Sequence, residues 1–268
     1  MSKIGFVGSG NMAEALIKGV LEAELYSPQD VLVSDIRPER LEQLRLQYHV
    51  TPLGNLELAS RSDALVLSVK PQNFADVLAE IAPAVRKDTL VISIAAGIKT
   101  GRIAAALKDV QIVRVMPNTP ALIGQGASAL YSSNASLQYM EIAKRIFAAV
   151  GKVVILTNES SMDAVTAVSG SGPAYFFLLM EAMIDSAQQL GIAEETARTL
   201  VLQTAKGATL LAEAASHDGA TPANLRDKVT SPGGTTEAAL KTLLLADFAG
   251  TVHTAITAAR DRSQELSA

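Results

Sequence analysis

The first residues of the chain constrain its fold most strongly. A short apolar run, Lys3–Val7, leads directly into Gly8-Ser9-Gly10-Asn11-Met12-Ala13, the pattern G-x-G-x-x-A, and an amphipathic stretch follows over Asn11–Glu24. In a βαβ unit the first glycine of this pattern permits a tight turn and the second lets a pyrophosphate approach the backbone, while the helix N-terminus offers N–H groups. The pattern predicts dinucleotide binding, and a purely structural glycine turn is the weaker alternative. The expected cofactor contacts here are Gly8, Ser9, Gly10, Asn11 and Met12.

Apolar runs alternate with amphipathic stretches through residues 1–158. Runs that are apolar throughout are typical of parallel strands covered on both faces, and their alternation with helices predicts an α/β Rossmann fold with a doubly wound parallel sheet. The predicted strands are Lys3–Val7, Val31–Ser34, Ala64–Val69, Thr89–Ile94, Gln111–Val115, Ala127–Tyr131 and Lys152–Ile155. The predicted helices between them include Asn11–Glu24, Pro38–Tyr48, Asn73–Ala82 and Ser136–Val150.

Strand patterns stop near residue 158, and helical periodicity continues to the end of the chain. The predicted helices are Met162–Ser169, Pro173–Leu190, Glu194–Ala215, Pro222–Lys228, Thr235–Leu244 and Ala249–Ser267. This change predicts a nucleotide-binding domain over 1–158 and an all-α domain over 159–268. Pro173–Leu190 has almost no polar face, so it must be buried on all sides. A domain of about 110 residues rarely achieves this alone, which favours a second subunit over a purely intrachain core.

Charge and composition limit the partners. Lys and Arg total 23 against 27 Asp and Glu, a net charge of -4, which gives no reason to expect a nucleic acid or a membrane as partner. No metal is expected, because the chain has no Cys and its three histidines lack metal-ligand spacing. Charges interrupt the N-terminal segment and no apolar run approaches the ~20 residues of a membrane span, so we expect a soluble, cytoplasmic protein.

The end of the second predicted strand bears on the choice of cofactor. It reads Ser34-Asp35-Ile36-Arg37, and we expect Ser34, Asp35 and Arg37 to contact the adenosine ribose. An acidic side chain favours the free 2′-hydroxyl of NADH, whereas Arg37 would bind the 2′-phosphate of NADPH. Arg37 would alternatively only solvate the start of the next helix. The residues therefore leave NADPH and NADH equally open.

Three loops follow predicted strands at the carboxyl edge of the sheet, where ligands of such sheets bind. Pro71 ends its strand and redirects the chain, so Lys70 is expected to face the cofactor cleft. Pro117 and Pro120 fix the loop that carries Asn118. Each loop alone is explained by turn chemistry, but three on one edge favour a cleft. The cofactor contacts expected in these loops are Val69, Lys70, Pro71, Ala95, Ala96, Gly97 and Asn118.

Two polar, glycine-rich segments interrupt the helical half. Ser169–Ala174 precedes the most apolar helix, and Thr230–Glu237 precedes a later one. Hydroxyls, adjacent glycines and a helix N-terminus together suit a small anion such as a carboxylate. Helix capping is the simpler alternative, but capping needs one Ser or Thr. It does not explain the run of Ser231, Gly233, Gly234, Thr235 and Thr236.

Together these motifs resemble the pyrroline-5-carboxylate reductase family along essentially the whole chain. The order and spacing of the matching segments also agree with the family. The segments are FVGSGNMAEAL (Phe6–Leu16), VKPQ (Val69–Gln72), SIAAGI (Ser93–Ile98), RVMPNTPALIGQG (Arg114–Gly126), VSGSGPAY (Val168–Tyr175) and LRDKVTSPGGTTEAAL (Leu225–Leu240). The last of them is specific to the family, whereas the first alone would not be.

The resemblance implies hydride transfer from NAD(P)H to the C=N bond of 1-pyrroline-5-carboxylate, which gives L-proline in the last step of proline biosynthesis. It implies that Thr236 bonds the imine nitrogen and that Lys70 and Asn118 line the nicotinamide side, so Thr236 and Lys70 are the catalytic candidates. The substrate carboxylate would be held by Ser231, Gly233, Gly234, Thr235 and Thr236.

The resemblance also implies an assembly. The helical domain would interlock with that of a second copy, and the loop of one subunit would act on the cofactor of the other, so that a homodimer is the catalytic unit. Whether five dimers join into a decamer is left open.

Two other functions are weighed against this one. A β-hydroxyacid dehydrogenase also joins a Rossmann domain to a helical domain, but it usually carries a lysine on the central helix, and Pro173–Phe177 contains none. A non-enzymatic NADPH-sensing module would need no second polar loop such as Ser231–Thr236.

Overall fold

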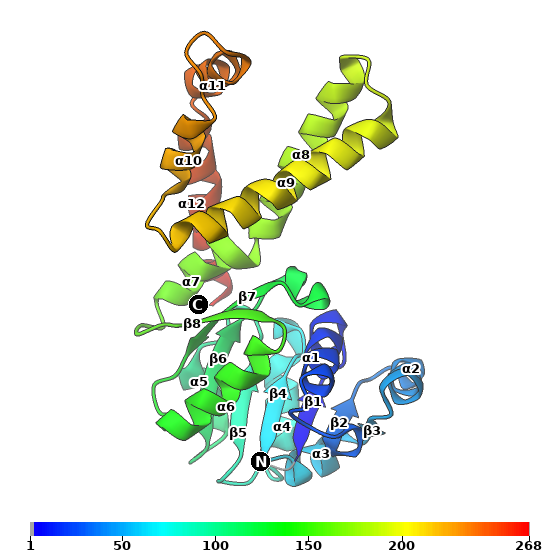
Figure 1. Ribbon diagram of the computed structural model, residues 1–268. Helices are drawn as coiled ribbons and strands as arrows, with labels where there is room; N and C mark the ends of the chain where they lie inside the picture. The colour runs from blue at the N-terminus through cyan, green and yellow to red at the C-terminus, as the bar shows by residue number, and fades with distance from the viewer. Residues whose placement is uncertain (1–2, 268) are drawn as a thin grey trace. The chain divides into compact units, whose positions relative to one another are not determined.

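The computed structural model describes residues 3–267 (Figure 1). The chain divides into two compact units. The described part of the first unit runs to Pro173 and resumes at Ala258, and the second unit is Ala174–Thr257. The first unit thus extends beyond the last predicted strand and includes the end of the C-terminal helix.

An eight-stranded sheet forms the centre of the first unit, in the order β3-β2-β1-β4-β5-β6-β7-β8. The strands are β1 (Ile4–Val7), β2 (Val31–Ser34), β3 (Thr51–Pro52), β4 (Ala64–Leu67), β5 (Leu90–Ser93), β6 (Gln111–Met116), β7 (Gly126–Tyr131) and β8 (Gly151–Ile155). Neighbouring strands are parallel except β6 and β7. The segment 117–125 is too short for a crossover, so the chain turns back and β7 runs antiparallel to β6. The predicted doubly wound sheet is confirmed, with this one reversal.

Helices cover both faces of the sheet (Figure 1). One face carries α1 (Asn11–Glu22), α2 (Pro38–Tyr48) and α6 (Leu137–Ala148), and the other carries α3 (Asn55–Arg61), α4 (Phe74–Ile81) and α5 (Thr100–Ala106). Every residue of β1, β2, β4 and β5 is buried, which explains why these strands are apolar throughout. Two hydrophobic cores result, one on each face of the sheet. Each fully buried Leu, Ile or Phe stabilises the folded state by roughly 1.5–3 kcal/mol, so these cores hold the unit together.

Short elements differ from the prediction. The sequence analysis did not identify β3, α3 or α5. Two strand residues or two helical turns give little periodicity, and α3 and α5 have no proline at their first position to mark a helix start. The 3₁₀ turns η1 (Pro28–Asp30), η2 (Pro71–Asn73) and η3 (Thr119–Ile123) lie in the connections. The predicted helix Met162–Ser169 is α7 (Ser161–Val165) followed by a π-helical turn, η4 (Thr166–Gly170).

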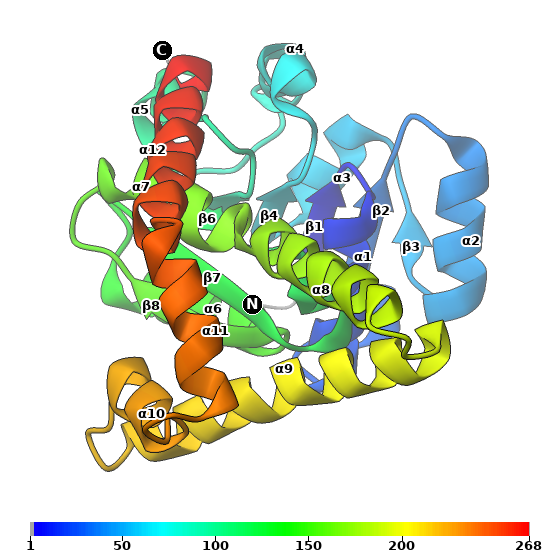
Figure 2. The same cartoon turned by 90° about the horizontal axis from the view of Figure 1, so that it is seen from above.

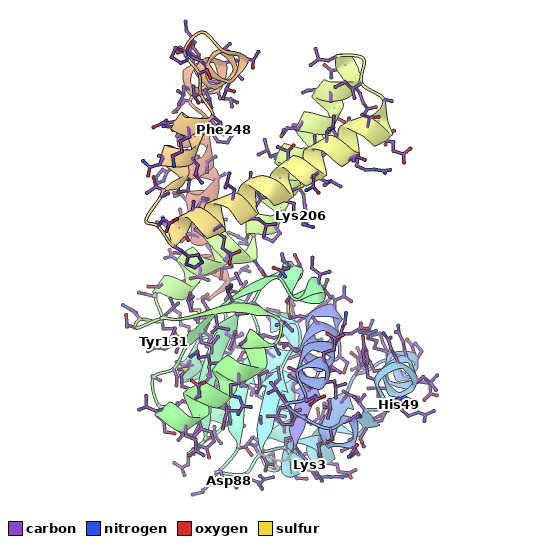
Figure 3. All side chains as sticks on the ribbon, in the orientation of Figure 1. Lys3, His49, Asp88, Tyr131, Lys206 and Phe248 are labelled. Carbon is purple, nitrogen blue, oxygen red and sulfur yellow. The ribbon has the colours of Figure 1, made fainter. Side chains whose placement is uncertain are left out.

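The remaining helices are α8 (Gly172–Gln189), α9 (Glu194–Ser216), α10 (Pro222–Lys228), α11 (Thr235–Leu245) and α12 (Phe248–Leu266). Within the second unit, α9 leads from the end of α8 to α10 (Figure 2). In a single chain, many large apolar side chains of the second unit are exposed, including Phe248 at the start of α12 (Figure 3). Phe176, Phe177 and Leu178 of α8 are 62%, 61% and 66% exposed. The alternative of a purely intrachain core for this helix is therefore wrong.

By length and composition alone, one described helix, Ser161–Gln189, would be able to cross a membrane, or two if the bent pair α11 and α12 is counted as one span. The same test is passed by the core helices of soluble proteins. The exposed apolar side chains must be covered by another subunit or by lipid, and length and composition do not distinguish these two.

Candidate active site

The loop between β1 and α1 fits a dinucleotide. Gly8 has φ +85°, and a Cβ on it would lie 2.9 Å from the Ser68 carbonyl oxygen, so only glycine is accommodated. Gly10 is the N-cap of α1, and a Cβ on it would meet no atom within 4 Å. The backbone at Gly10 is therefore open to a ligand. No side chain caps α1, so its first N–H groups remain for the pyrophosphate, assisted by the helix dipole.

Ser9, in the same loop, is completely buried and holds the loop in place. Its N–H donates to Asp35 Oδ2 at 2.9 Å, its hydroxyl donates to the Ser34 carbonyl oxygen at 3.0 Å, and its own carbonyl oxygen accepts from Arg40 Nε at 2.7 Å. All its polar groups are thus bonded within the protein. Ser34 is also buried, and its backbone serves this loop. For Ser9 and Ser34 the geometry supports a positioning role in place of the expected contact with the cofactor.

Asp35 and Arg37 form one ion pair at the end of β2. Arg37 Nε lies 2.9 Å from Asp35 Oδ1, and the Arg37 amide donates to the same oxygen at 3.0 Å. Burial raises the pKa of Asp35, but hydrogen bonds from Arg37 and Ser9 outweigh it, so the net pKa lies below its ordinary value. The Asp35 side chain is 8% exposed and that of Arg37 is 53% exposed. Arg37 is therefore the more accessible charge of the pair.

A second network behind the loop was missed by the sequence analysis. Arg40 of α2 forms an ion pair with Glu14 of α1, and the Tyr48 hydroxyl donates to Glu14 Oε1 at 3.0 Å. Burial, together with the hydrogen bond to Glu14, raises the pKa of Tyr48. Because Arg40 also bonds to Ser9, α2 anchors both the loop and the first turn of α1. The signal that would have indicated it is an arginine in the first turn after Pro38.

The segment that follows β4 lies beside the glycine loop. The Ser68 hydroxyl donates to the Val7 carbonyl oxygen at 3.1 Å and also to the Gly8 carbonyl oxygen, and Val69 is the side chain nearest the space over Gly8. Lys70 is exposed, and its side chain makes no hydrogen bond or ion pair within residues 3–267. The structure thus brings the loops after β1 and β4 together and leaves the Lys70 ammonium available.

The loop after β5 has a different neighbour from the one expected. Gly97 has φ +76°, and a Cβ on it would lie 2.9 Å from the carbonyl oxygen of Leu266, near the end of α12. Ala95 and Gly97 are buried, and Ala96 is half-buried. The need for glycine at 97 therefore comes from the C-terminal helix. Cofactor binding by this loop stays a prediction that the geometry does not support directly.

Asn118 uses its amide to connect segments of the protein. Its Nδ2 donates to the Ser169 carbonyl oxygen at 3.1 Å, and its Oδ1 accepts from the Ala127 N–H at 2.8 Å. This side chain joins the β6–η3 connection to β7 and to η4. The expectation that its amide points at a ligand is not supported, and its role in the site would be to hold the loop.

The predicted anion-binding segment lies between α10 and α11, in the second unit. Gly234 donates its N–H to the Ser231 carbonyl oxygen at 2.9 Å, and Gly233 has φ +72°. With Pro232 at the second position this is a type II turn. Gly234 is the N-cap of α11 and no side chain caps it. The Thr236 hydroxyl makes no hydrogen bond within the described residues, so the segment offers free donors at a helix N-terminus.

A groove with a volume of about 870 Å³ runs along α10 and α11 beside this turn. Its charged groups balance, since Arg226 is paired with Asp227 at 3.0 Å and Lys241 is accompanied by Glu237, and leucines from α11 give it an apolar part. The lining residues are Arg226, Asp227, Thr230, Gly233, Gly234, Glu237, Ala238, Leu240, Lys241, Leu244 and Leu245. The groove suits the apolar body of a small molecule, and the free hydroxyl donors of the adjacent turn suit an anionic group on it.

Comparisons with known proteins give matches to both the N-terminal and the C-terminal part of the chain. A family model described as NADP oxidoreductase coenzyme F420-dependent matches residues 3–97, and one described as pyrroline-5-carboxylate reductase dimerisation matches residues 159–266. The pyrroline-5-carboxylate reductase of Pseudomonas aeruginosa is 45% identical over 268 residues, which cover 99% of this chain and 97% of that protein.

Solved structures give the same result. A pyrroline-5-carboxylate reductase from Coxiella burnetii superposes with a TM-score of 0.91 at 38% identity, covering 100% of this chain and 99% of that one. The Plasmodium falciparum pyrroline carboxylate reductase, solved with NADP bound, has a TM-score of 0.89 at 32% identity and covers 100% and 98%. With this similarity extending over both halves, the chain belongs to the pyrroline-5-carboxylate reductase family of NAD(P)H-dependent oxidoreductases.

Proposed function

We propose that this protein reduces 1-pyrroline-5-carboxylate to L-proline with NAD(P)H, the last step of proline biosynthesis. The observation that carries the proposal is the 45% identity to a pyrroline-5-carboxylate reductase over 99% of the chain. The open backbone at Gly10 and the hydroxyl-rich turn before α11 supply what this reaction needs, a dinucleotide site and a carboxylate site.

The chemistry asks mainly for positioning. The bound cofactor supplies the hydride, and a protonated imine is already electrophilic, so neither a strong base nor a metal is required. In this proposal the Thr236 hydroxyl bonds the imine nitrogen and the exposed Lys70 lines the nicotinamide side with the loop that Asn118 fixes. The substrate carboxylate is held by donors of Ser231, Thr235 and Thr236. The expected contacts from Gly233 and Gly234 are not available, because their N–H groups are bonded to Glu237 and to the Ser231 carbonyl oxygen, so these glycines shape the turn.

The cofactor is placed by the first unit. Gly10, Asn11 and Met12 receive the pyrophosphate at the N-terminus of α1. The Asp35–Arg37 pair meets the adenosine ribose, and the loop containing Val69 and Pro71 adjoins the nicotinamide end.

We further propose that NADPH is the preferred cofactor. The Asp35 carboxylate already accepts hydrogen bonds from Ser9 and Arg37 and is almost buried, so it has little capacity left for a ribose hydroxyl. Arg37 is half exposed and presents the charge that a 2′-phosphate would bind. The relative from Plasmodium falciparum, solved with NADP bound, is consistent with this choice.

The protein is a homo-oligomer that acts on a small molecule. We propose that the dimer is the catalytic unit, with the Ser231–Thr236 loop of one subunit acting on the cofactor of the other, that five dimers form a decamer, and that the enzyme is cytoplasmic. Light scattering coupled to size-exclusion chromatography distinguishes a dimer from a decamer directly.

The direct test is the loss of NADPH or NADH absorbance when the enzyme is mixed with 1-pyrroline-5-carboxylate. Oxidation with proline as product supports the proposal, and the ratio of kcat/KM values gives the cofactor preference. Cofactor binding without oxidation would contradict the proposed substrate and redirect the search to other imines or hydroxyacids.

A further inference from the structure

Glu237, in the first turn of α11, is bonded to the turn that precedes its own helix. Its Oε2 accepts a hydrogen bond from the Gly233 N–H at 2.7 Å. No other side-chain hydrogen bond holds this turn within the described residues, and Glu237 also lines the groove along α10 and α11. The contact lies at the centre of the segment assigned to the substrate carboxylate.

Ordinary helix capping does not explain this bond. A glutamate at the third helical position usually reaches back to the N–H of the N-cap residue. Here the N-cap is Gly234, and its N–H is already donated to the Ser231 carbonyl oxygen at 2.9 Å. Glu237 reaches one residue further back, to Gly233, so the bond acts on the turn itself.

The N–H that Glu237 holds belongs to the central peptide of the turn, between Pro232 and Gly233. Type I and type II turns differ by a flip of this peptide, and the type II form needs a positive φ at the third residue. Gly233 has φ +72°. Glycine tolerates both forms at little cost, so the turn residues alone do not select one of them. An acceptor that is hydrogen-bonded to the Gly233 N–H selects one orientation of the peptide.

We propose that Glu237 is a positioning residue that fixes the orientation of the Pro232–Gly233 peptide and so keeps the carboxylate-binding loop ready for substrate. This rests on the proposed role of Ser231–Thr236. Glu237 contacts neither substrate nor cofactor in this account. Lys241, in the same groove, carries a positive charge that offsets the repulsion between the Glu237 carboxylate and an anionic substrate, whereas Arg226 is paired with Asp227 at 3.0 Å.

Removing the anchor lets the peptide sample both orientations, and apparent affinity falls in proportion to the competent fraction. Glu237→Ala is expected to raise the KM for 1-pyrroline-5-carboxylate about tenfold, as a competent fraction of about one tenth would. The kcat should change by less than about threefold, because the bound substrate selects the correct orientation of the peptide. NADPH affinity should not change, because Glu237 does not contact the cofactor.

The experiment compares wild type with Glu237→Ala, Glu237→Gln and Glu237→Asp. The Gln variant keeps an acceptor oxygen at the same reach and should restore the KM, whereas Asp is one methylene short and should behave like Ala. Glu194→Ala, in the first turn of α9, is the matched control for loss of an acidic residue near a helix N-terminus. Melting temperatures show whether each variant is folded.

A substrate without the carboxylate separates this role from general damage. Turnover of 1-pyrroline should change much less in Glu237→Ala than turnover of 1-pyrroline-5-carboxylate. 1-Pyrroline lacks the carboxylate that the Ser231–Gly234 turn helps to hold, and it needs only Thr236, in the first turn of α11, for its imine nitrogen. A wild-type KM in the Ala variant, equal losses in Gln and Ala, or equal losses on both substrates would overturn the proposal. Failure of the proposed function itself looks different, since the wild-type enzyme would then not reduce 1-pyrroline-5-carboxylate at all.

Discussion

Single residues in this site act in two different ways. Ser9 and Arg40 are bonded to each other and to neighbouring residues, and these bonds hold the backbone of the loop that is proposed to bind the cofactor. Arg37 and Thr236 keep groups that remain available for a ligand. Substitutions of the second kind should therefore change kinetics with little effect on stability.

Thr236→Ala is expected to lower kcat by roughly 10- to 100-fold, the effect of losing one positioned hydrogen bond in the transition state. Cofactor binding should remain nearly intact, because Thr236 belongs to the other unit of the chain. Steady-state kinetics and NADPH titration by fluorescence measure the two quantities. A variant with wild-type kcat would remove Thr236 from the mechanism.

Arg37→Ala should raise the KM for NADPH by roughly 10-fold or more, the effect of losing a charge-assisted hydrogen bond, and should change the KM for NADH much less. The comparison of both cofactors in one variant is its own control for damage to the fold. Equal effects on NADPH and NADH would show that Arg37 does not bind the 2′-phosphate.

At the scale of helices and strands, the prediction succeeded where burial imposes a pattern. The bounds of β2, α2 and α10 agree with the expected residues, because two of them have prolines at their first position and β2 is buried throughout. The reversal at β7 and the elements β3, α3 and α5 were not predicted. β3 has two residues, and α3 and α5 are as short as α10 but lack the proline that marks its first position.

The positions of the site loops in the sequence were predicted, but their contacts with distant residues were not. The segments containing Gly10, Lys70 and Ser231 were singled out by their residue types, and their roles in binding stay predictions. One partner of Asn118, in η4, and the neighbour of Gly97, in α12, are more than 50 residues away in sequence. No local pattern shows such contacts, and for the same reason the bonds of Ser9 to Arg40 and Asp35 were missed.

One element, the end of α12, is held in the first unit by a buried hydrogen bond. Ser263 donates its hydroxyl to Asp163 Oδ1 at 2.7 Å, and both residues are buried. Among the described residues, Ser263→Ala leaves the Asp163 side chain with only the longer bond from Ser267, so we expect a loss of about 1–3 kcal/mol in unfolding free energy. Urea unfolding measures it, with the exposed Ser60→Ala on α3 as the control. Equal midpoints for the two variants would contradict this account.

At the scale of the whole molecule, the exposed apolar side chains of the second unit determine how the protein must assemble. Monomeric soluble proteins rarely expose contiguous apolar surface of this kind. The large apolar residues of the second unit that a single chain leaves exposed are Phe176, Phe177, Leu178, Leu179, Met183, Leu190, Ile192, Leu200, Leu202, Leu210, Leu211, Val229, Leu243, Leu244, Leu245, Phe248 and Val252. A homo-oligomer covers such surface, and the match to a dimerisation family over 159–266 accounts for the hydropathy of α8 without a membrane.

Mixed dimers test whether two subunits share an active site. Gly10→Val should fold, because a Cβ at Gly10 meets no protein atom, but it should block the pyrophosphate. If the loop of one subunit serves the cofactor of the other, random mixing of Gly10→Val and Thr236→Ala subunits should recover about a quarter of wild-type activity, since half the dimers are mixed and each has one intact site. No recovery after verified mixing would place both halves of the site on one subunit.

The central claim is that hydride passes from the nicotinamide to the imine carbon of 1-pyrroline-5-carboxylate. The most direct measurement supplies NADPH, and separately NADH, deuterated at the transferable position and analyses the product by mass spectrometry. The account predicts L-proline carrying one deuterium at the ring carbon that had been part of the C=N bond. Unlabelled proline, or no proline while the protein binds the cofactor, would contradict it.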